Sequence, residues 1–228
     1  MKNWKLLTLI LALVVVLAAC GSDDKSKESD KEVTKETQTA AGTENSAYPM
    51  TISPTMASTE SEEAGTINFK DVTLDAMPEK IVVFDYGFLD TLHTLGVEGI
   101  VGLAKDSNLP EHLSEYASDE YASVGSLKEP LLEDIAELDP DVIFISGRQS
   151  PFYDQLSDIA PVVFVGTSQT DYWNTFMKSV ELAGKIFGKE DQVKEELAKF
   201  DAAIEEVKTL AGNYDNILVS MYNEGKIS

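Results

Sequence analysis

An arginine directly after an apolar run stands out in the stretch IFISGRQSPFYDQL, residues 143–156. The chain has 40 acidic and 18 basic residues and a formal net charge of −22. A cation at a strand end is therefore more informative here than in a chain of balanced charge. A guanidinium pairs with oxyanions through a fork of N–H donors and stacks on aromatic rings. Arg148 therefore either closes a surface turn or faces an anionic ligand, and the residues alone leave both interpretations open.

Polar side chains also follow the other apolar runs. Ligands of an open α/β sheet bind outside the carboxyl ends of its strands, so the residues after each run form a candidate rim. Lys105 ends one rim segment, and Ser126 joins the rim if its loop, SVGSLKEP, follows a short strand. The other rim segments are residues 85–88, 146–149 and 166–169. Together they offer two cations, hydroxyls, amides and aromatic rings, which predicts a binding surface for an anionic and partly aromatic molecule.

The same segments lack the residues of several common active sites. No Ser or Cys nucleophile stands beside a histidine there, and the sequence has neither a glycine-rich phosphate loop nor the spacing of a metal site. His93 and His112 are expected in structural or solvated positions on helices. We therefore predict a binding protein rather than an enzyme, with no catalytic residue, cofactor or resident metal. Its acidity excludes electrostatic binding of nucleic acid.

The elements that hold this rim alternate between strands and helices from residue 66 onward. Short apolar runs predict strands over residues 80–85, 99–104, 141–146 and 161–166. Helical patterns lie between or after them, over residues 86–96, 109–116, 130–140, 150–159 and 171–188. This alternation predicts an α/β fold with a parallel sheet. A hairpin is expected before the sheet, over residues 66–75, and a further strand over residues 216–222.

A long helix is predicted over residues 190–211. Apolar side chains recur along it every three or four residues, at Val193, Leu197, Phe200, Ile204, Val207 and Ala211. They form one narrow seam along about 33 Å, at 1.5 Å per residue. A helix with such a seam is expected to run along the back of a domain.

The first 65 residues predict export and anchoring. Lys2 and Lys5 precede an apolar run that is too short for a membrane span and suits a signal peptide over residues 1–19. The stretch LAAC resembles a lipobox, so Cys20 is the predicted lipidated residue. Residues 20–65 are predicted to be this cysteine and a disordered tether rich in Ser, Thr, Glu and Lys. Cys20 is the only cysteine, so the chain has no disulfide framework.

The tether, the alternation of strands and helices and the long helix resemble a class III substrate-binding lipoprotein of an iron-chelate ABC importer. The stretches VGLAKDSNLPEHL, VGSLKEPLLEDIAELDPDVIFISGRQSPFYDQLSDIAPVVFVG and GKIS are similar to the branch that binds ferric catecholate siderophores of the enterobactin and petrobactin kind. The resemblance implies two lobes joined by a long helix. Residues 66–189 would form a Rossmann-like first lobe, 190–212 the interlobe helix, and 213–228 the first strand of a truncated second lobe.

The resemblance also implies roles for single residues. The family places the arginine of SGRQ against the chelate, which makes Arg148 the first candidate ligand, Lys105 the second and Ser126 the third. Glu133 matches the acidic residue through which this lobe docks on the permease. The implied ligand is an Fe(III)-siderophore complex, and the implied partners are an ABC permease and its ATPase. The protein would be held on the extracytoplasmic face of the cell membrane only by the lipid on Cys20.

Other functions remain open at this point. A ferric hydroxamate, haem or a cobalamin could replace the catecholate, and a near-neutral hydroxamate would depend less on Arg148. A tethered surface enzyme would need a phosphate loop or a nucleophile–base pair at the strand ends. An adhesion lipoprotein would respond to no small ligand at all.

Overall fold

The computed structural model describes residues 47–62 and 64–214, together with residues 216, 218, 220, 222, 223, 226 and 227. Its centre is a five-stranded sheet in which every neighbouring pair is parallel. The strand order is β7 (Ala122–Ser123), β6 (Ile100–Leu103), β5 (Ile81–Val83), β8 (Val142–Ile145) and β9 (Val162–Phe164). The four predicted strands and the parallel sheet are therefore confirmed, and β7 supplies the short strand on which the placement of Ser126 depended.

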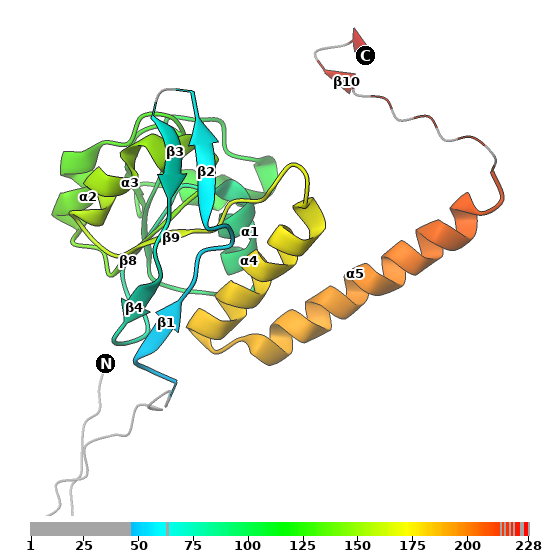
Figure 1. Cartoon of the computed structure of the whole chain (residues 1–228), viewed down its shortest axis with the longest axis horizontal. Coiled ribbons are helices and arrows are strands. Elements are labelled where there is room, and N and C mark those ends of the chain that lie inside the picture. The colour runs from blue at the N-terminus through cyan, green and yellow to red at the C-terminus, as the bar shows by residue number, and fades with distance from the viewer. Residues whose placement is uncertain are drawn as a thin grey trace, which may run out of the picture. The chain divides into compact units, whose positions relative to one another are not determined.

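The central strands are buried on both faces, which explains why they read as unbroken apolar runs. Alternate side chains of β5 enter two different cores. Ile81 and Val83 contact the cluster that includes residues of α1 (Tyr86–Thr94) and α4 (Tyr172–Phe187). Val82 enters the cluster formed with α2 (Leu132–Leu138) and α3 (Tyr153–Ser157). Figure 1 shows the latter two helices on the other side of the sheet from α4. Each fully buried aliphatic side chain contributes roughly 1.5–3 kcal/mol.

Local sequence signals set the ends of the helices. The Asp85 carboxylate accepts a hydrogen bond from the Phe88 amide at 2.8 Å and caps α1. Helix α4 ends at Gly188 with φ +63°. The helix predicted over residues 109–116 is the 3₁₀ helix η1 (Glu111–Ala117). The helix predicted over residues 150–159 begins within the 3₁₀ helix η2 (Gly147–Phe152) and continues as the α-helix α3.

The segment before the sheet corrects two predictions. The two halves of the expected hairpin do not pair with each other, because β4 (Val72–Leu74) pairs with β1 (Met50–Ile52) and β3 (Gly65–Asn68) pairs with β2 (Ser58–Ser61). The described residues between 47 and 65 are therefore part of the lobe, and their assignment to the tether is wrong. Composition does not reveal these strands, because a few apolar side chains are enough to anchor a strand when alternation points them into the core. Ile52 is only 1% exposed. Cys20 and the predicted signal peptide lie outside the described residues.

Helix α5 (Glu190–Ala211) has the predicted bounds. Its first turns pack on the lobe, where Val193 is buried and Leu197 contacts the same core as α1. Gln192 adds a hydrogen bond of 3.1 Å from its side-chain nitrogen to the Thr94 carbonyl. Farther along the seam, Phe200 and Val207 are exposed. The predicted seam is thus covered by the lobe only near the start of the helix.

The strand predicted over residues 216–222 is wrong at three of the positions that the structure describes. Residues 216, 218 and 220, which the structure describes, lie outside any strand. Among the described residues of this segment, Tyr222 alone lies in a strand, β10 (Tyr222–Asn223), which pairs antiparallel with β11 (Lys226–Ile227). A short apolar run is stable as a strand only where other strands pair with it. Over the part of the chain that the structure describes, no helix has the length and apolar character needed to cross a bilayer.

Candidate functional site

The strand order places the candidate rim at a reversal point of the sheet. The chain adds β6 and β7 on one side of β5, then returns to add β8 and β9 on the other side. In open α/β sheets, the crevice outside the carboxyl ends at such a point is the usual ligand site. Asp85 follows β5 there and Ser146 follows β8. The predicted rim segments therefore do meet at one edge of the sheet.

Arg148 lies at this edge, on the first turn after β8. Its side chain is exposed, whereas the next two residues, Gln149 and Ser150, are buried. It is the only arginine among the 228 residues. Among the residues that the structure describes, no carboxylate forms an ion pair with it. The guanidinium is thus placed to meet an anion from solvent.

Lys105 has a structural role that the sequence did not reveal. Its ammonium group donates hydrogen bonds to the carbonyls of Ser118 at 2.9 Å and Tyr121 at 3.0 Å. These bonds hold the connection between η1 and β7, and they use two of the three N–H donors of the lysine. As a ligand, Lys105 would therefore offer one N–H and its charge.

Ser126 lies in a tight turn after β7. Its hydroxyl oxygen accepts hydrogen bonds from the amides of Lys128 at 3.2 Å and Glu129 at 3.0 Å. The turn begins at Gly125, whose φ is +94° and where an added Cβ would lie 2.3 Å from the Glu129 carbonyl oxygen. The Ser126 hydroxyl keeps its proton as the donor that it can offer to a ligand.

Gln149 also lies at the candidate site, although it was not among the predicted site residues. Its side-chain oxygen accepts a hydrogen bond from the Ser146 amide at 3.0 Å, and its side-chain nitrogen donates one to the Leu127 carbonyl. The spacing Ser-x-x-Gln, which is typical of a capping box, was the available signal for the first bond. The second bond joins the segment of Arg148 to the segment of Ser126.

Thr55 is a second missed residue, and it comes from the segment predicted to be a tether. Its amide donates to the Phe164 carbonyl at 3.0 Å, and its hydroxyl donates to the Gly166 carbonyl at 2.7 Å. These bonds hold the carboxyl end of β9 in place. The aromatic rings expected on the rim are less accessible than predicted, because Phe88 is in the core and the Tyr86 hydroxyl donates to the Ala104 carbonyl.

Glu133 is exposed in the first turn of α2, beside Asp134. Carboxylates at this position interact favourably with the helix dipole, which gives both residues a local role. The assignment of Glu133 as the docking residue stays a prediction.

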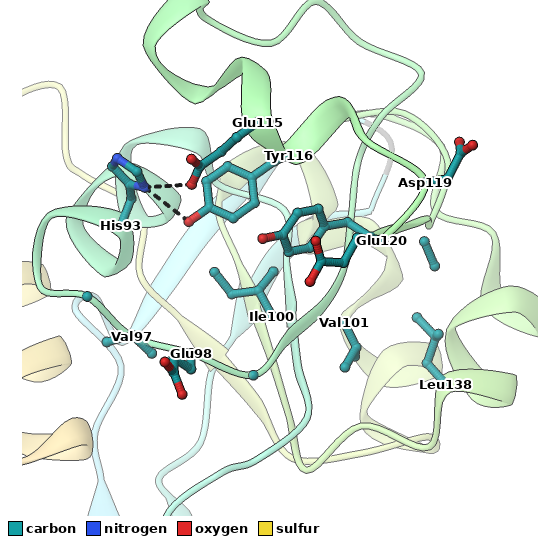
Figure 2. A pocket seen from close by; sticks show the side chains of 14 residues that line it. His93, Val97, Glu98, Ile100, Val101, Glu115, Tyr116, Asp119, Glu120 and Leu138 are labelled. Carbon is teal, nitrogen blue, oxygen red and sulfur yellow. Dashed lines mark hydrogen bonds and ion pairs between the residues drawn. The ribbon is translucent and has the colours of Figure 1, made fainter. Parts of the chain in front are cut away.

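A cavity of about 910 Å³ lies away from the rim, at the amino ends of β6 and β7. Figure 2 shows Glu115 and Tyr116 pointing toward His93, whose Nδ1 is 3.0 Å from a Glu115 carboxylate oxygen and 3.3 Å from the Tyr116 hydroxyl. Burial raises the pKa of Tyr116 to about 12, and the Glu115 charge acts in the same direction. The carboxylates of its lining, at Glu98, Glu115, Asp119 and Glu120, would repel an anion.

Known proteins are similar to this chain in both sequence and fold. Residues 81–226 match the model of the periplasmic binding protein family Peripla_BP_2. The petrobactin-binding protein YclQ of Bacillus subtilis is 40% identical over 229 residues, which cover 100% of this chain and 65% of that protein. Its crystal structure superposes with a TM-score of 0.65 at 44% identity, over 75% of this chain and 59% of that one.

A second solved structure is the periplasmic catecholate-siderophore binding protein VctP of Vibrio cholerae. It gives a TM-score of 0.61 at 30% identity, over 75% of this chain and 59% of that one. The chain thus spans less than two thirds of these relatives. The predicted class III α/β fold with its long helix is confirmed, and the chain belongs to the periplasmic binding protein family.

Proposed function

We propose that this chain is the solute-binding component of an ABC importer and that it captures a ferric catecholate siderophore at the carboxyl rim of its sheet. The observation that carries this proposal is the position of Arg148. The only arginine of a strongly acidic chain is exposed at the reversal point of the sheet, the usual place for a ligand. The similarity to a petrobactin-binding and a catecholate-binding protein supports the same ligand class.

Charge favours this ligand over the alternatives. A ferric tris-catecholate carries three negative charges and presents flat, electron-rich rings. One cation at about 6 Å interacts with each unit charge by roughly 3 kcal/mol at an effective dielectric constant of 20, before screening by salt. An arginine can also stack on a catechol ring, which a lysine does less well. A ferric trihydroxamate is near neutral and would gain much less from Arg148.

The remaining parts of the assignment follow from this role. A solute-binding protein presents its cargo to a permease driven by an ATPase, and Glu133 is our candidate for the docking contact. We further propose that the chain catalyses no reaction and that Cys20 carries the lipid that anchors it on the extracytoplasmic face. Lys105 and Ser126 would contribute one donor each beside Arg148.

A fluorescence titration of the full chain tests the ligand and the site together. Trp173, which is 40% exposed, and the tyrosines report binding of a ferric tris-catecholate or a ferric trihydroxamate. We expect tighter binding of the catecholate and a loss of at least about tenfold in Arg148→Ala, equivalent to about 1.4 kcal/mol. Lys80→Ala is the matched control, because it removes the same charge beside the amino end of β5. Equal affinity for both chelates, unchanged by Arg148→Ala, would contradict the proposal.

A further inference from the structure

We propose that Gln149 is a positioning residue that locks the segment carrying Arg148 to the loop carrying Ser126, so that a chelate meets one preformed surface. This inference rests on the proposed function, because it assumes that Arg148 contacts the ligand. The bond from the Gln149 side chain to the Leu127 carbonyl carries it.

This bond joins two loops that follow strands which are not neighbours in the sheet. Leu127 follows β7 and Gln149 follows β8, and β6 and β5 lie between these two strands. Neighbouring strands are about 4.8 Å apart, so the two strands are separated by roughly 14 Å. The loops must therefore bend toward each other over the ends of β5 and β6. The Gln149–Leu127 bond closes this span at the reversal point of the sheet.

The side chain of Gln149 is held in this position by burial and by hydrogen bonds at both ends of its amide. It is 0% exposed, its oxygen accepts from the Ser146 amide at 3.0 Å, and its nitrogen donates to the Leu127 carbonyl. The first bond fixes the start of η2, and the second fixes the neighbouring loop. Because both ends of the amide have partners, a shift of either loop would leave a buried polar group unpaired, which is unfavourable.

Further bonds extend the lock to the third loop of the rim. The Leu127 amide donates to the Ser107 hydroxyl at 3.0 Å, and the Asp106 amide donates to the Gly125 carbonyl at 3.1 Å. The loops after β6, β7 and β8 are thus joined in one network, and Gln149 is the connection to the segment of Arg148. Arg148 is the adjacent residue, so a rotation of η2 would move its guanidinium directly. Preformed sites bind more tightly because less order must be created on binding.

A double-mutant cycle separates positioning from a general structural role. Gln149→Met keeps an unbranched side chain of similar length and removes both bonds. We expect it to weaken ferric tris-catecholate binding by about tenfold in the wild-type background. In the Arg148→Ala background the same change should cost less than about threefold, because the group that Gln149 positions is already gone. Gln192→Met is the matched control, since it removes a similar bond to a backbone carbonyl far from the rim.

Hydrogen exchange without ligand gives a second, independent readout. In Gln149→Met, the amides of residues 126–129 and 146–150 should exchange faster together, while those of β5 stay unchanged. If Gln149→Met does not fold, Gln149→Glu keeps the acceptor for the Ser146 amide, and its carboxylate replaces the N–H donor and repels the Leu127 carbonyl. The same exchange pattern is then expected.

Each outcome decides the question. Wild-type affinity in Gln149→Met, or an equal loss in both backgrounds, overturns the positioning role, as does faster exchange in only one of the loops. A wild-type chain that binds neither chelate overturns the proposed function instead. The exchange data then decide alone whether Gln149 locks the two loops.

Discussion

The hydroxyl of Thr55 donates a hydrogen bond to the carbonyl of Gly166 at 2.7 Å, across 111 residues of sequence. The bond joins the segment before the sheet to the carboxyl end of β9, where the candidate rim segment 166–169 begins. Thr55 is 5% exposed, so its partner cannot easily be replaced by water. The residues that lead into the lobe thus also stabilise the edge that carries the candidate site.

Loss of this hydroxyl should destabilise the protein. Thr55→Val keeps the shape of the side chain but leaves the buried Gly166 carbonyl without its bond, which typically costs about 1–3 kcal/mol. Chemical denaturation followed by circular dichroism measures the free energy of unfolding. Thr51→Val, at an exposed position of β1, is the matched control and should change stability by less than about 0.5 kcal/mol. Equal effects of the two substitutions would show that the Thr55 bond contributes nothing.

Ile52 should behave as a core residue although it lies in a segment of tether-like composition. Ile52→Ala removes a side chain that is 1% exposed and leaves a cavity, so the free energy of unfolding should fall by about 2–5 kcal/mol. Thermal and denaturant unfolding measure this loss. Leu218→Ala is the control, because Leu218 is 89% exposed and its truncation should be nearly neutral. If Ile52→Ala left the free energy of unfolding unchanged, this segment would belong to the tether rather than to the lobe.

The structural role of Lys105 can be tested separately from its proposed contact with the ligand. If Lys105 stabilises the fold, Lys105→Met should make the protein less stable. The substitution removes two charge-assisted hydrogen bonds, to the carbonyls of Ser118 and Tyr121. For this partly exposed group we expect about 1–2 kcal/mol in the free energy of unfolding. Lys128→Met removes an exposed lysine nearby and is the control. Unchanged stability together with weaker chelate binding would show that Lys105 acts on the ligand alone.

Alkaline pH should destabilise the lobe through two tyrosines. Burial raises the pKa of Tyr48 and of Tyr116 to about 12, from an ordinary value near 10. The folded state therefore holds these two protons when the unfolded state releases them. The stabilisation is fully present below pH 10 and is lost as the pH rises from about 10 to 12.

Denaturant unfolding between pH 9 and 12, with tyrosinate absorbance as a second signal, measures this loss. Tyr116→Phe should make the decline with pH shallower, and Tyr172→Phe, at an exposed tyrosine, should leave it unchanged. An identical pH profile in wild type and Tyr116→Phe would exclude a contribution from Tyr116.

Local patterns in the sequence predicted much of the framework. The apolar runs of β5, β6, β8 and β9 were recognisable because both faces of these strands are buried. Helix α5 was predicted with its bounds because its spacing is regular over many turns. The position of Arg148 followed from the end of β8, since a parallel sheet brings the carboxyl ends of its strands to one edge.

Long-range contacts decided the rest. β4 pairs with β1 and β3 pairs with β2, whereas the apolar pattern of residues 66–75 fits a hairpin between β3 and β4 equally well. The structural role of Lys105 and the span from Gln149 to Leu127 depend on backbone carbonyls that carry no signature in the sequence. The sequence by itself determined the order of the elements and the placement of Arg148 at a strand end, because periodicity and strand direction are local properties. Only the tertiary structure decided what holds Arg148 in position, because hydrogen-bond partners are chosen by the three-dimensional approach of distant segments.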